Sequence, residues 1–254
     1  METGYGYFGA RYYDSGLSIW LSVDPMSDKY PSMSPYNYCA NNPVILVDPD
    51  GKSPWPAILY GAGVIMENLI PDANVRTVGY AIQHPINALR VGEVKAGSTN
   101  LSTIASNFQI NICRRAGLST GNEGDQGNAY RHTLWQAILT NEFGNSQAER
   151  IGNTHEHNPN ADLTQRKFAN MGLADQVVDL KNNQIGRKIG REHKGASNQE
   201  LALLTLDQFY NDGLWTTVTN KDKTVSIVKT RITKEQYEAA RTEILRKNEN
   251  GMDK

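Results

Sequence analysis

The spacing of hydrophobic and polar residues changes along the chain and divides it into three stretches. Residues 4–23 are rich in aromatic residues and glycine, and Leu17 to Val23 alternates apolar with small polar residues after the turn signal Asp14-Ser15-Gly16. This pattern predicts a β-hairpin. From Gly127 onward, apolar residues recur at helical spacing between capping residues and glycine stops. Proline and glycine interrupt residues 53–125 so often that only short helices or loops are predicted there.

The C-terminal stretch carries clear start and stop signals for helices. They predict helices over Asn128–Phe143, from the capping box at Ser146 to before Asn158, from about Asp162 to Arg191 with a bend near Gly172, from Ser197 to Gly213, and from Thr233 onward. Leu214–Thr219 and Thr224–Ile232 predict a hairpin. The predicted fold class is therefore α+β, with a turn-rich β module followed by a mostly helical domain that contains one small β-hairpin.

Three regions follow from this division. Residues 1–52 form the β module, in which Asp-Pro, Tyr-Pro, Ser-Pro and Asn-Pro steps predict extended backbone folded by turns. Residues 126–254 form the helical domain. Residues 53–125 are either a linker or the first layer of that domain, and the sequence leaves both open.

Composition excludes several classes of protein. The chain has 254 residues, and its 26 Lys and Arg against 27 Asp and Glu exclude a strongly basic nucleic-acid binder, so no stable nucleic-acid partner is predicted. Two cysteines, Cys39 and Cys113, are too few for a disulfide framework and are interpreted as free thiols. The apolar run that ends at Glu67 is shorter than the ~18 residues of a membrane span, and the N-terminus lacks the pattern of a signal peptide.

The averages conceal a change of composition near residue 52. Seven of the 12 tyrosines lie within the first 38 residues, whereas 23 of the 26 Lys and Arg lie beyond Lys52. Residues 1–52 are net acidic and the remainder is weakly basic. Two different kinds of chain are joined at this point.

Several motifs in the first region match a known pattern in order. They are Tyr7-Phe8-Gly9-Ala10-Arg11-Tyr12-Tyr13-Asp14, Trp20 to Pro25, Pro35 to Val44, and Val47-Asp48-Pro49-Asp50-Gly51. The region resembles the Rhs-repeat-associated core, the end of the YD-repeat shell of bacterial polymorphic toxins. The resemblance implies that the residues after about 52 are an effector for interbacterial competition. It also implies an upstream Rhs shell, a cognate immunity protein, and delivery from a bacterium into a target cell.

The same resemblance implies a self-cleavage site. Some Rhs proteins release the toxin by aspartyl autoproteolysis, and the matching positions here are Asp24 and Asp48, with the scissile bond after Lys52. Two carboxylates that share a proton can hydrolyse a peptide bond. Lys52 stands where that pattern has leucine, however, so the alternative is that both aspartates only form turns before proline.

Acidic residues of the predicted helix from 162 to 191 gather on one side. Asp175, Asp179 and Asn183 fall within an arc of roughly 100°, whereas Lys181 and Lys188 point nearly the opposite way. An inward carboxylate needs a metal, a cation or dense hydrogen bonding. The alternative is that these aspartates cap helices or pair with arginines.

Histidines on the two preceding helices complete a candidate site. Arg131-His132 lies inside the first helix with Trp135 one turn on, and His155-Glu156 ends the second. Nitrogen and oxygen ligands of this kind bind Zn²⁺ or Mn²⁺. The layout is similar to that of the helical metallohydrolases, the HD phosphohydrolases and the zinc phospholipase C type, although no diagnostic motif matches. A buried histidine with a purely structural hydrogen bond is the alternative.

The predicted roles are as follows. The predicted metal ligands are His132, His155, Glu156 and Asp179. His132 and Glu156 are also predicted to act in catalysis, and Arg131 and Arg187 to hold an anionic substrate. The predicted supporting residues are Asn128, Trp135, Asp175 and Asn183. The block from Asn128 to Arg187 also resembles an uncharacterised domain at the ends of bacterial Rhs and wall-associated proteins, which implies no particular reaction.

Two functions remain open from the sequence. The first is a metal-assisted hydrolase that cuts a phosphodiester in nucleic acid or lipid. The second is a non-enzymatic effector that contacts a membrane or a partner through the apolar residues 58–70 and whose polar cluster is structural.

Overall fold

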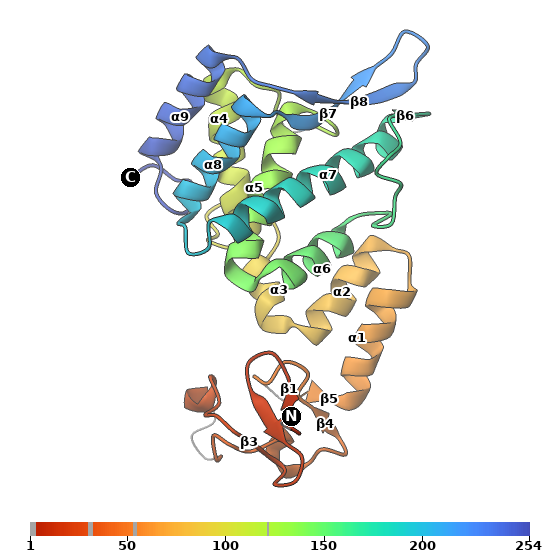
Figure 1. The fold of residues 1–254 in the computed structure, drawn as a ribbon, viewed down its shortest axis with the longest axis vertical. Coiled ribbons are helices and arrows are strands. Elements are labelled where there is room, and N and C mark those ends of the chain that lie inside the picture. Colours follow the sequence, from red (N-terminus) through yellow and green to blue (C-terminus); the bar gives the residue numbers. More distant parts are fainter. Residues whose placement is uncertain (1–3, 30–32, 53–54, 121) are drawn as a thin grey trace. The chain divides into compact units, whose positions relative to one another are not determined.

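The computed structural model describes residues 4–29, 33–52, 55–120 and 122–254 (Figure 1). The chain forms two compact units, one from residues 1–70 and 78–85 and the other from residues 71–77 and 86–254. Small antiparallel sheets and a mostly helical second unit confirm the α+β class. The predicted domain boundaries after residues 52 and 125 stay predictions.

The elements follow one another in this order: β1 (Gly6–Tyr7), β2 (Tyr12–Asp14), β3 (Ile19–Trp20), η1 (Ser27–Lys29), η2 (Cys39–Asn41), β4 (Leu46–Val47), β5 (Trp55–Pro56), α1 (Ala57–Leu69), α2 (Ala73–Gln83), α3 (Pro85–Val91), α4 (Leu101–Ala116), α5 (Gln126–Phe143), α6 (Asn145–His155), β6 (Lys167–Phe168), α7 (Met171–Glu192), α8 (Asn198–Asn211), β7 (Leu214–Thr219), β8 (Val225–Thr230) and α9 (Lys234–Arg246).

The first unit begins with a three-stranded antiparallel sheet. Strands β1, β2 and β3 pair in sequence order, and the turn between β2 and β3 lies where the sequence predicts it. There the Asp14 carboxylate accepts hydrogen bonds from the backbone N–H groups of Gly16 and Leu17. Phe8, Tyr13 and Tyr38 pack around the fully buried Trp20. Edge-to-face aromatic contacts therefore supply much of the small core that 50 residues can build.

Helix α4 lies in the middle region, residues 53–125, where the sequence predicts only short helices or loops. Asn100 caps its N-terminus, Gly117 ends it in the left-handed conformation, and Ile104, Phe108 and Ile112 are buried. The helix packs on α5 and α9. Residues 101–116 therefore form a layer of the second unit, because their apolar face is part of its core.

Helix α5 is the centre of the second unit. It is buried on nearly every side, and α4, α6, α7 and α8 pack around it. A helix that is buried on nearly every side has no broad solvent face, so most of its polar residues need partners inside the protein. Tyr130 does so by donating to the carbonyl oxygen of Ala202.

The predicted start of the third helix is wrong. Helix α7 begins at Met171, where Asn170 caps it through the N–H of Leu173, and not near residue 162. Residues 167–168 instead form β6, which pairs with β8 to give a sheet in the order β6-β8-β7. The sheet covers α7 through a small apolar core that includes Phe168, Val178 and Ile227. Pairing with a distant strand therefore prevails over the local helical pattern.

The capping predictions have mixed outcomes. The boxes at Ser197 and Thr233 are confirmed at the starts of α8 and α9, and the hairpin β7–β8 is confirmed as well. The box predicted at Ser146 is wrong, since α6 starts at Asn145 behind Gly144 without a side-chain cap. Cys39 and Cys113 are both free, as predicted.

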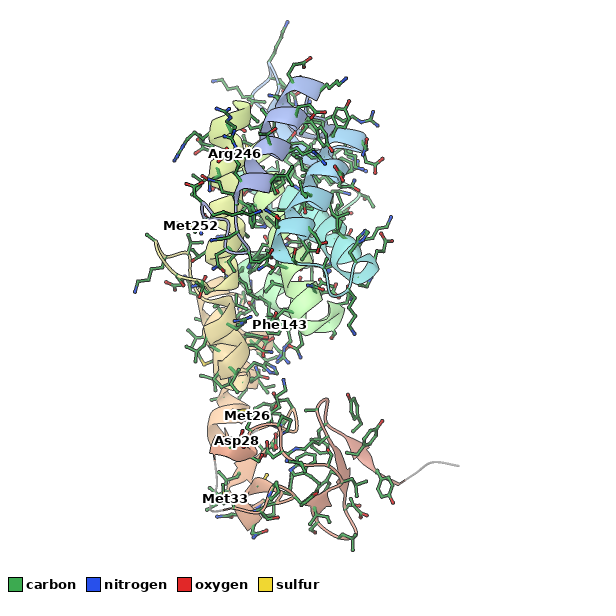
Figure 2. All side chains as sticks on the ribbon, turned by 90° about the vertical axis from the view of Figure 1, so that its left-hand side faces the viewer. Met26, Asp28, Met33, Phe143, Arg246 and Met252 are labelled. Atoms are coloured by element: carbon green, nitrogen blue, oxygen red, sulfur yellow. The ribbon has the colours of Figure 1, made fainter. Side chains whose placement is uncertain are left out.

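The segment that follows α9 returns to α4, where Met252 lies beside the helix (Figure 2). Asn107 donates to the carbonyl oxygen of Asn250, and Asn111 donates to that of Gly251. The C-terminal residues are therefore anchored by side-chain hydrogen bonds. Within the described residues, no helix has both the length and the apolar character that crossing a membrane takes.

Close contact between α5 and α7 depends on Gly186. A Cβ atom there would lie 2.1 Å from the carbonyl oxygen of Thr133, whereas at Gly172, on the same helix, the nearest atom would be 3.8 Å away. We expect Gly186→Ala to lower the free energy of unfolding by about 1–3 kcal/mol because the helices must separate. Gly172→Ala is the matched control, with an expected change near zero. Urea unfolding followed by circular dichroism measures both, and equal effects would contradict the close-packing explanation.

Candidate metal centre

Three side chains from separate elements converge in the second unit. His132 of α5, Glu156 at the end of α6 and Asp179 of α7 each offer one ligand atom, and these atoms lie within 4.8 Å of one another. Glu156 and Asp179 are buried, and His132 is largely so. Three of the four predicted metal ligands are thus brought together.

Local structure explains why these residues meet. His132 lies in the middle of α5 and faces α7, where Asp179 stands on the arc that the sequence predicts to point inward. Helix α6 ends at His155, and Glu156 takes up extended backbone as its C-cap. Arg76 of α2 donates to the backbone carbonyl oxygen of Glu156 and so holds this turn in place.

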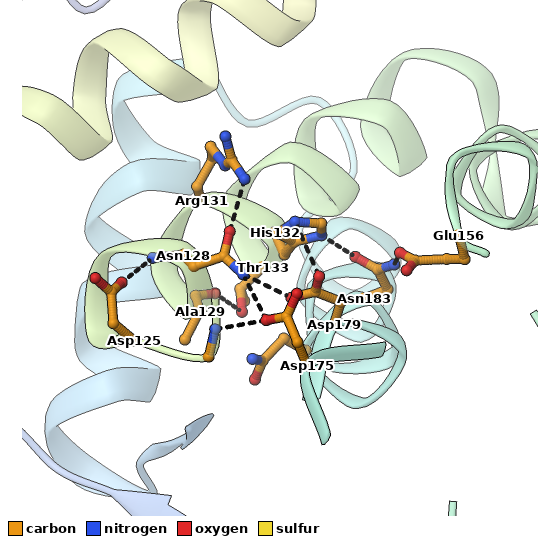
Figure 3. Close-up of polar contacts among 12 residues, drawn as sticks. Asp125, Asn128, Ala129, Arg131, His132, Thr133, Glu156, Asp175, Asp179 and Asn183 are labelled. Carbon is orange, nitrogen blue, oxygen red and sulfur yellow. Dashed lines mark hydrogen bonds and ion pairs between the residues drawn. The ribbon is translucent and has the colours of Figure 1, made fainter. Parts of the chain in front are cut away.

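A chain of hydrogen bonds connects the cluster (Figure 3). Arg131 donates to Asn128 Oδ1 at 2.6 Å, and Asn128 Nδ2 donates to Asp179 Oδ1 at 2.9 Å. The other carboxylate oxygen of Asp179 lies 3.5 Å from His132 Nε2. On the far side, His132 Nδ1 lies 3.3 Å from Asn183 Oδ1, and Asn183 Nδ2 donates to Glu156 Oε1 at 3.0 Å.

This network assigns the tautomer of His132. Because the Asn183 amide nitrogen donates to the carboxylate of Glu156, its carbonyl oxygen is left to accept a hydrogen bond from His132 Nδ1–H. In the neutral ring, Nε2 then carries a lone pair, and this lone pair faces the carboxylate of Asp179. Two electron-rich atoms at 3.5 Å repel unless a proton or a metal cation lies between them. A histidine whose Nδ1–H is held by an amide oxygen is the usual arrangement of a metal ligand that binds through Nε2.

The distance between His132 and Asp179 also suits a metal ion. Two ligand atoms that each lie about 2.1 Å from one ion in tetrahedral geometry are about 3.4 Å apart. The separation of His132 Nε2 and Asp179 Oδ2 is 3.5 Å. One imidazole nitrogen and two carboxylates are donors that Zn²⁺ and Mn²⁺ accept, and three protein ligands leave a coordination position open.

Burial and crowding of negative charge shift the pKa values of the cluster. Burial, followed by the nearby Asp175, raises the pKa of Asp179 well above its usual range. Burial is also the main cause that raises the pKa of Glu156 to about 7. Burial lowers the pKa of His132, although Glu156 opposes this shift. Metal-free, the cluster therefore holds its negative charge at a cost, which a bound cation would offset.

The predicted supporting residues contact the cluster. Asn128 and Asn183 are the two amides of the hydrogen-bond chain, and Asp175 accepts from Asn128 Nδ2 at 3.3 Å and from the backbone N–H of Gly124. Trp135 packs beside His132, with ring centroids 6.4 Å apart. The two amides therefore orient the ligands, and Trp135 lines the space beside them.

Two predicted site residues lie elsewhere. His155 is not in the three-residue group, because the backbone turns at the end of α6 and its ring packs edge-on against Trp135 at 5.3 Å. The ring is partly exposed, but the atoms crowded around it and the nearby His132 lower its pKa to about 4. Arg187 is buried against Glu149 and Gln136 and does not line the neighbouring pocket.

A pocket of about 280 Å³ opens beside the cluster. His132 belongs to its wall together with Arg131, Trp135 and His155, and residues from the α3–α4 connection and α4 complete it. A group bound in this pocket would lie against the metal-facing histidine. The structure thus supplies a space for a substrate next to the candidate metal ligands.

In the first unit, the predicted self-cleavage residues share one partner. Arg11 Nη2 lies 3.0 Å from Asp24 and 3.1 Å from Asp48, and its guanidinium stacks on Trp20. Asp48 also accepts from the backbone N–H of Lys52. Burial raises the pKa of Asp48, although Arg11 opposes this shift. An arginine shared by two carboxylates is typical of a structural role. The residue after the predicted scissile bond, Ser53, lies outside the described residues.

Two contacts of the site carry no sequence signal. Arg76 reaches the carbonyl oxygen of Glu156 from 80 residues away, and the Gly124 N–H reaches Asp175 across 51 residues. Both depend on backbone atoms, whose positions no residue pattern encodes.

Comparison with known proteins adds a family and several partial relatives. A family described as "Domain of unknown function (DUF6973)" matches residues 80–214, a range that contains His132, Glu156 and Asp179. No solved structure gives a significant match.

The curated relatives match only a part of the chain. Toxin subunit YenC2 of Yersinia entomophaga is 42% identical over 52 residues, which is 20% of this chain and 5% of that protein. The tRNA(Glu)-specific nuclease WapA of Bacillus subtilis subsp. natto is 39% identical over 66 residues, 25% of this chain and 3% of that protein. Salivary gland surface protein 1 of Aedes aegypti is 38% identical over 65 residues, 26% of this chain and 2% of that protein. The chain is therefore similar, over short segments, to far longer proteins that include toxins.

Proposed function

The chain belongs to the family described as "Domain of unknown function (DUF6973)", and from this premise we propose that it is the effector end of a bacterial toxin whose second unit is a metal-dependent hydrolase. The observation that supports the proposal is the meeting of His132, Glu156 and Asp179, with His132 Nε2 3.5 Å from a carboxylate oxygen of Asp179.

Each residue of the cluster has a role in this proposal. His132, Glu156 and Asp179 would hold Zn²⁺ or Mn²⁺, which would supply a Lewis acid for activating water and for stabilising charge on a phosphodiester. Asn183 fixes the ring of His132 and the carboxylate of Glu156, and Asn128 fixes Asp179. Glu156 belongs to the same cluster and is placed to accept a proton from water there. Arg131 provides the positive charge at the pocket wall.

The toxin part of the proposal depends on likeness. Motifs between Tyr7 and Gly51 resemble the Rhs-repeat-associated core; of the partial relatives, one is named as a toxin subunit and another as a tRNA-specific nuclease. On this proposal, an upstream Rhs shell carries the chain, a cognate immunity protein protects the producing cell, and the effector acts inside a competing bacterium.

Thermal unfolding with and without metal tests the metal centre. Asp179→Asn removes one buried negative charge. The metal-free variant is therefore expected to unfold at a higher temperature than the metal-free wild type, with a free energy of unfolding that is larger by about 1–3 kcal/mol. Addition of Zn²⁺ or Mn²⁺ is expected to stabilise the wild type and to leave Asp179→Asn nearly unchanged.

Glu192→Gln provides the matched control, because Glu192 lies on the same helix with an exposed side chain. It should respond to metal as the wild type does. If both variants and the wild type respond equally, or if none responds, the cluster is structural and the metal centre is wrong.

The non-enzymatic alternative has its own observation. Helix α1 carries Val64, Ile65 and Leu69 with exposed side chains, while Ile58 lies among the residues whose side chains are not described. Such a face could contact a membrane or a partner. This function is favoured if a folded chain without the metal ligands still kills cells.

A further inference from the structure

Aromatic and apolar side chains make up most of the wall of the pocket beside the metal cluster. They are Trp135, His155, Val94 and Ala105, while Arg131 adds a permanent positive charge and Glu93 adds a negative one. His132 connects the pocket to the cluster, because its ring belongs to both. A ligand with a flat apolar part and an anionic part would match both features at once.

The aromatic wall is already fixed in place. Trp135 Nε1 donates to Ser102 Oγ at 3.1 Å, which holds the indole against α4. The ring of His155 stands nearly perpendicular to it, at 82° and 5.3 Å between centroids. Two rings held edge-to-face form a corner against which a third flat ring can stack. Such a pocket needs little rearrangement to accept a planar group.

Arg131 has donors to spare for an anion. Among the described residues, its side-chain hydrogen bond goes to Asn128, so further N–H groups of the guanidinium remain for a ligand. A guanidinium binds phosphate through two parallel hydrogen bonds more readily than an ammonium does. Asn128 accepts a hydrogen bond from Arg131 and donates one to Asp179, so it connects Arg131 to the metal ligands.

We propose that this pocket binds one nucleotide unit, with its base against Trp135 and His155 and its phosphate between Arg131 and the metal cluster. The inference rests on the proposed function, since it names the substrate class of the same site. The shared chemistry is that of a nucleotide phosphoester, which a free nucleotide or an unpaired nucleotide in a strand can supply.

Size and charge favour this ligand over the alternatives. At about 280 Å³ the pocket lies at the lower end of the range for small-molecule sites, which is too small for the two acyl chains of a phospholipid. A long duplex would need a broad basic surface, and the chain as a whole has a net charge of −1. Binding of one base and one phosphate requires only a small pocket and one cationic side chain, which Arg131 provides.

Calorimetric titration of adenosine 5′-monophosphate into the full chain tests the proposal. Val94 lines the pocket with 57% of its surface exposed, so Val94→Glu adds a negative charge there without disturbing the core. Leu245→Glu on α9 is the matched control, since Leu245 is 43% exposed and outside the pocket. We expect Val94→Glu to weaken binding at least about tenfold and Leu245→Glu to change it less than twofold.

Further ligands separate the base from the phosphate. Ribose 5-phosphate should bind at least about tenfold more weakly than the nucleotide, because it lacks the stacking group. A single-stranded RNA hexamer that binds much more tightly than the free nucleotide identifies a strand as the source, and equal affinity identifies a free nucleotide. Equal binding of ribose 5-phosphate, insensitivity to Val94→Glu, or displacement by dihexanoylphosphatidylcholine overturns the proposal.

Titration with a chelator and then with Mn²⁺ separates this inference from the metal centre. If the nucleotide binds in a Val94-dependent way but metal has no effect on the wild type, the pocket is right and the metal centre is wrong. If metal stabilises the protein and the nucleotide does not bind with or without it, the metal centre stands and the nucleotide pocket is wrong.

Discussion

Bacteria that express the His132→Ala, Glu156→Ala double variant without an immunity protein are expected to survive, whereas the unmodified chain is expected to reduce colony formation at least about 100-fold. Loss of a residue that only orients a metal ligand already costs 10–100-fold in metal affinity or activity. Removal of two of the three side chains that meet in the cluster should cost more. Colony counts after induction measure the effect.

The control for this experiment changes the same residue types away from the cluster. His157→Ala with Glu192→Ala alters an exposed histidine and an exposed glutamate outside the group. This control should kill as the unmodified chain does. Circular dichroism must show that both double variants fold. A folded His132→Ala, Glu156→Ala chain that still kills would favour the non-enzymatic effector.

Arg11→Met is expected to destabilise the first unit by about 3–5 kcal/mol. Arg11 is 2% exposed and Asp48 is 1% exposed, so the substitution leaves a buried carboxylate without its cation. It also removes hydrogen bonds to the carbonyl oxygens of Gly51 and Pro35 and the stacking on Trp20. Hydrogen exchange of the backbone amides between residues 4 and 52 measures the loss directly.

Two further variants separate charge burial from packing. In Arg11→Met with Asp48→Asn, the unpaired charge is gone, so part of the lost stability should return. Arg90→Met removes an exposed pair with Glu142 and should change stability by less than about 1 kcal/mol. If Arg11→Met and Arg90→Met lower the free energy of unfolding by similar amounts, Arg11 stabilises the protein no more than an exposed arginine does.

The sequence predicts the candidate site well where a helix carries the signal. The separation of Asp179 from Lys181 and Lys188 follows from 3.6-residue periodicity, and α7 does turn Asp179 toward His132. Capping boxes at Ser197 and Thr233 depend on neighbouring residues only, so they are predicted correctly as well.

Predictions are wrong where distant contacts decide. Strand β6 forms because β8 offers it hydrogen bonds, and its own two residues give no strand pattern. The choice between His155 and Glu156 depends on the backbone turn after α6, which Arg76 helps to hold. The sequence therefore predicts the residue types of the cluster, whereas tertiary structure decides that Glu156, and not His155, enters it.

Anomalous X-ray scattering from crystals of the full chain grown with Zn²⁺ tests the metal centre most directly. We expect one strong peak about 2 Å from His132 Nε2 and within bonding distance of carboxylate oxygens of Glu156 and Asp179, with the peak absent in Asp179→Asn crystals. A wild-type map without a peak at this cluster, or with zinc held by exposed histidines such as His157 or His193 instead, would contradict it.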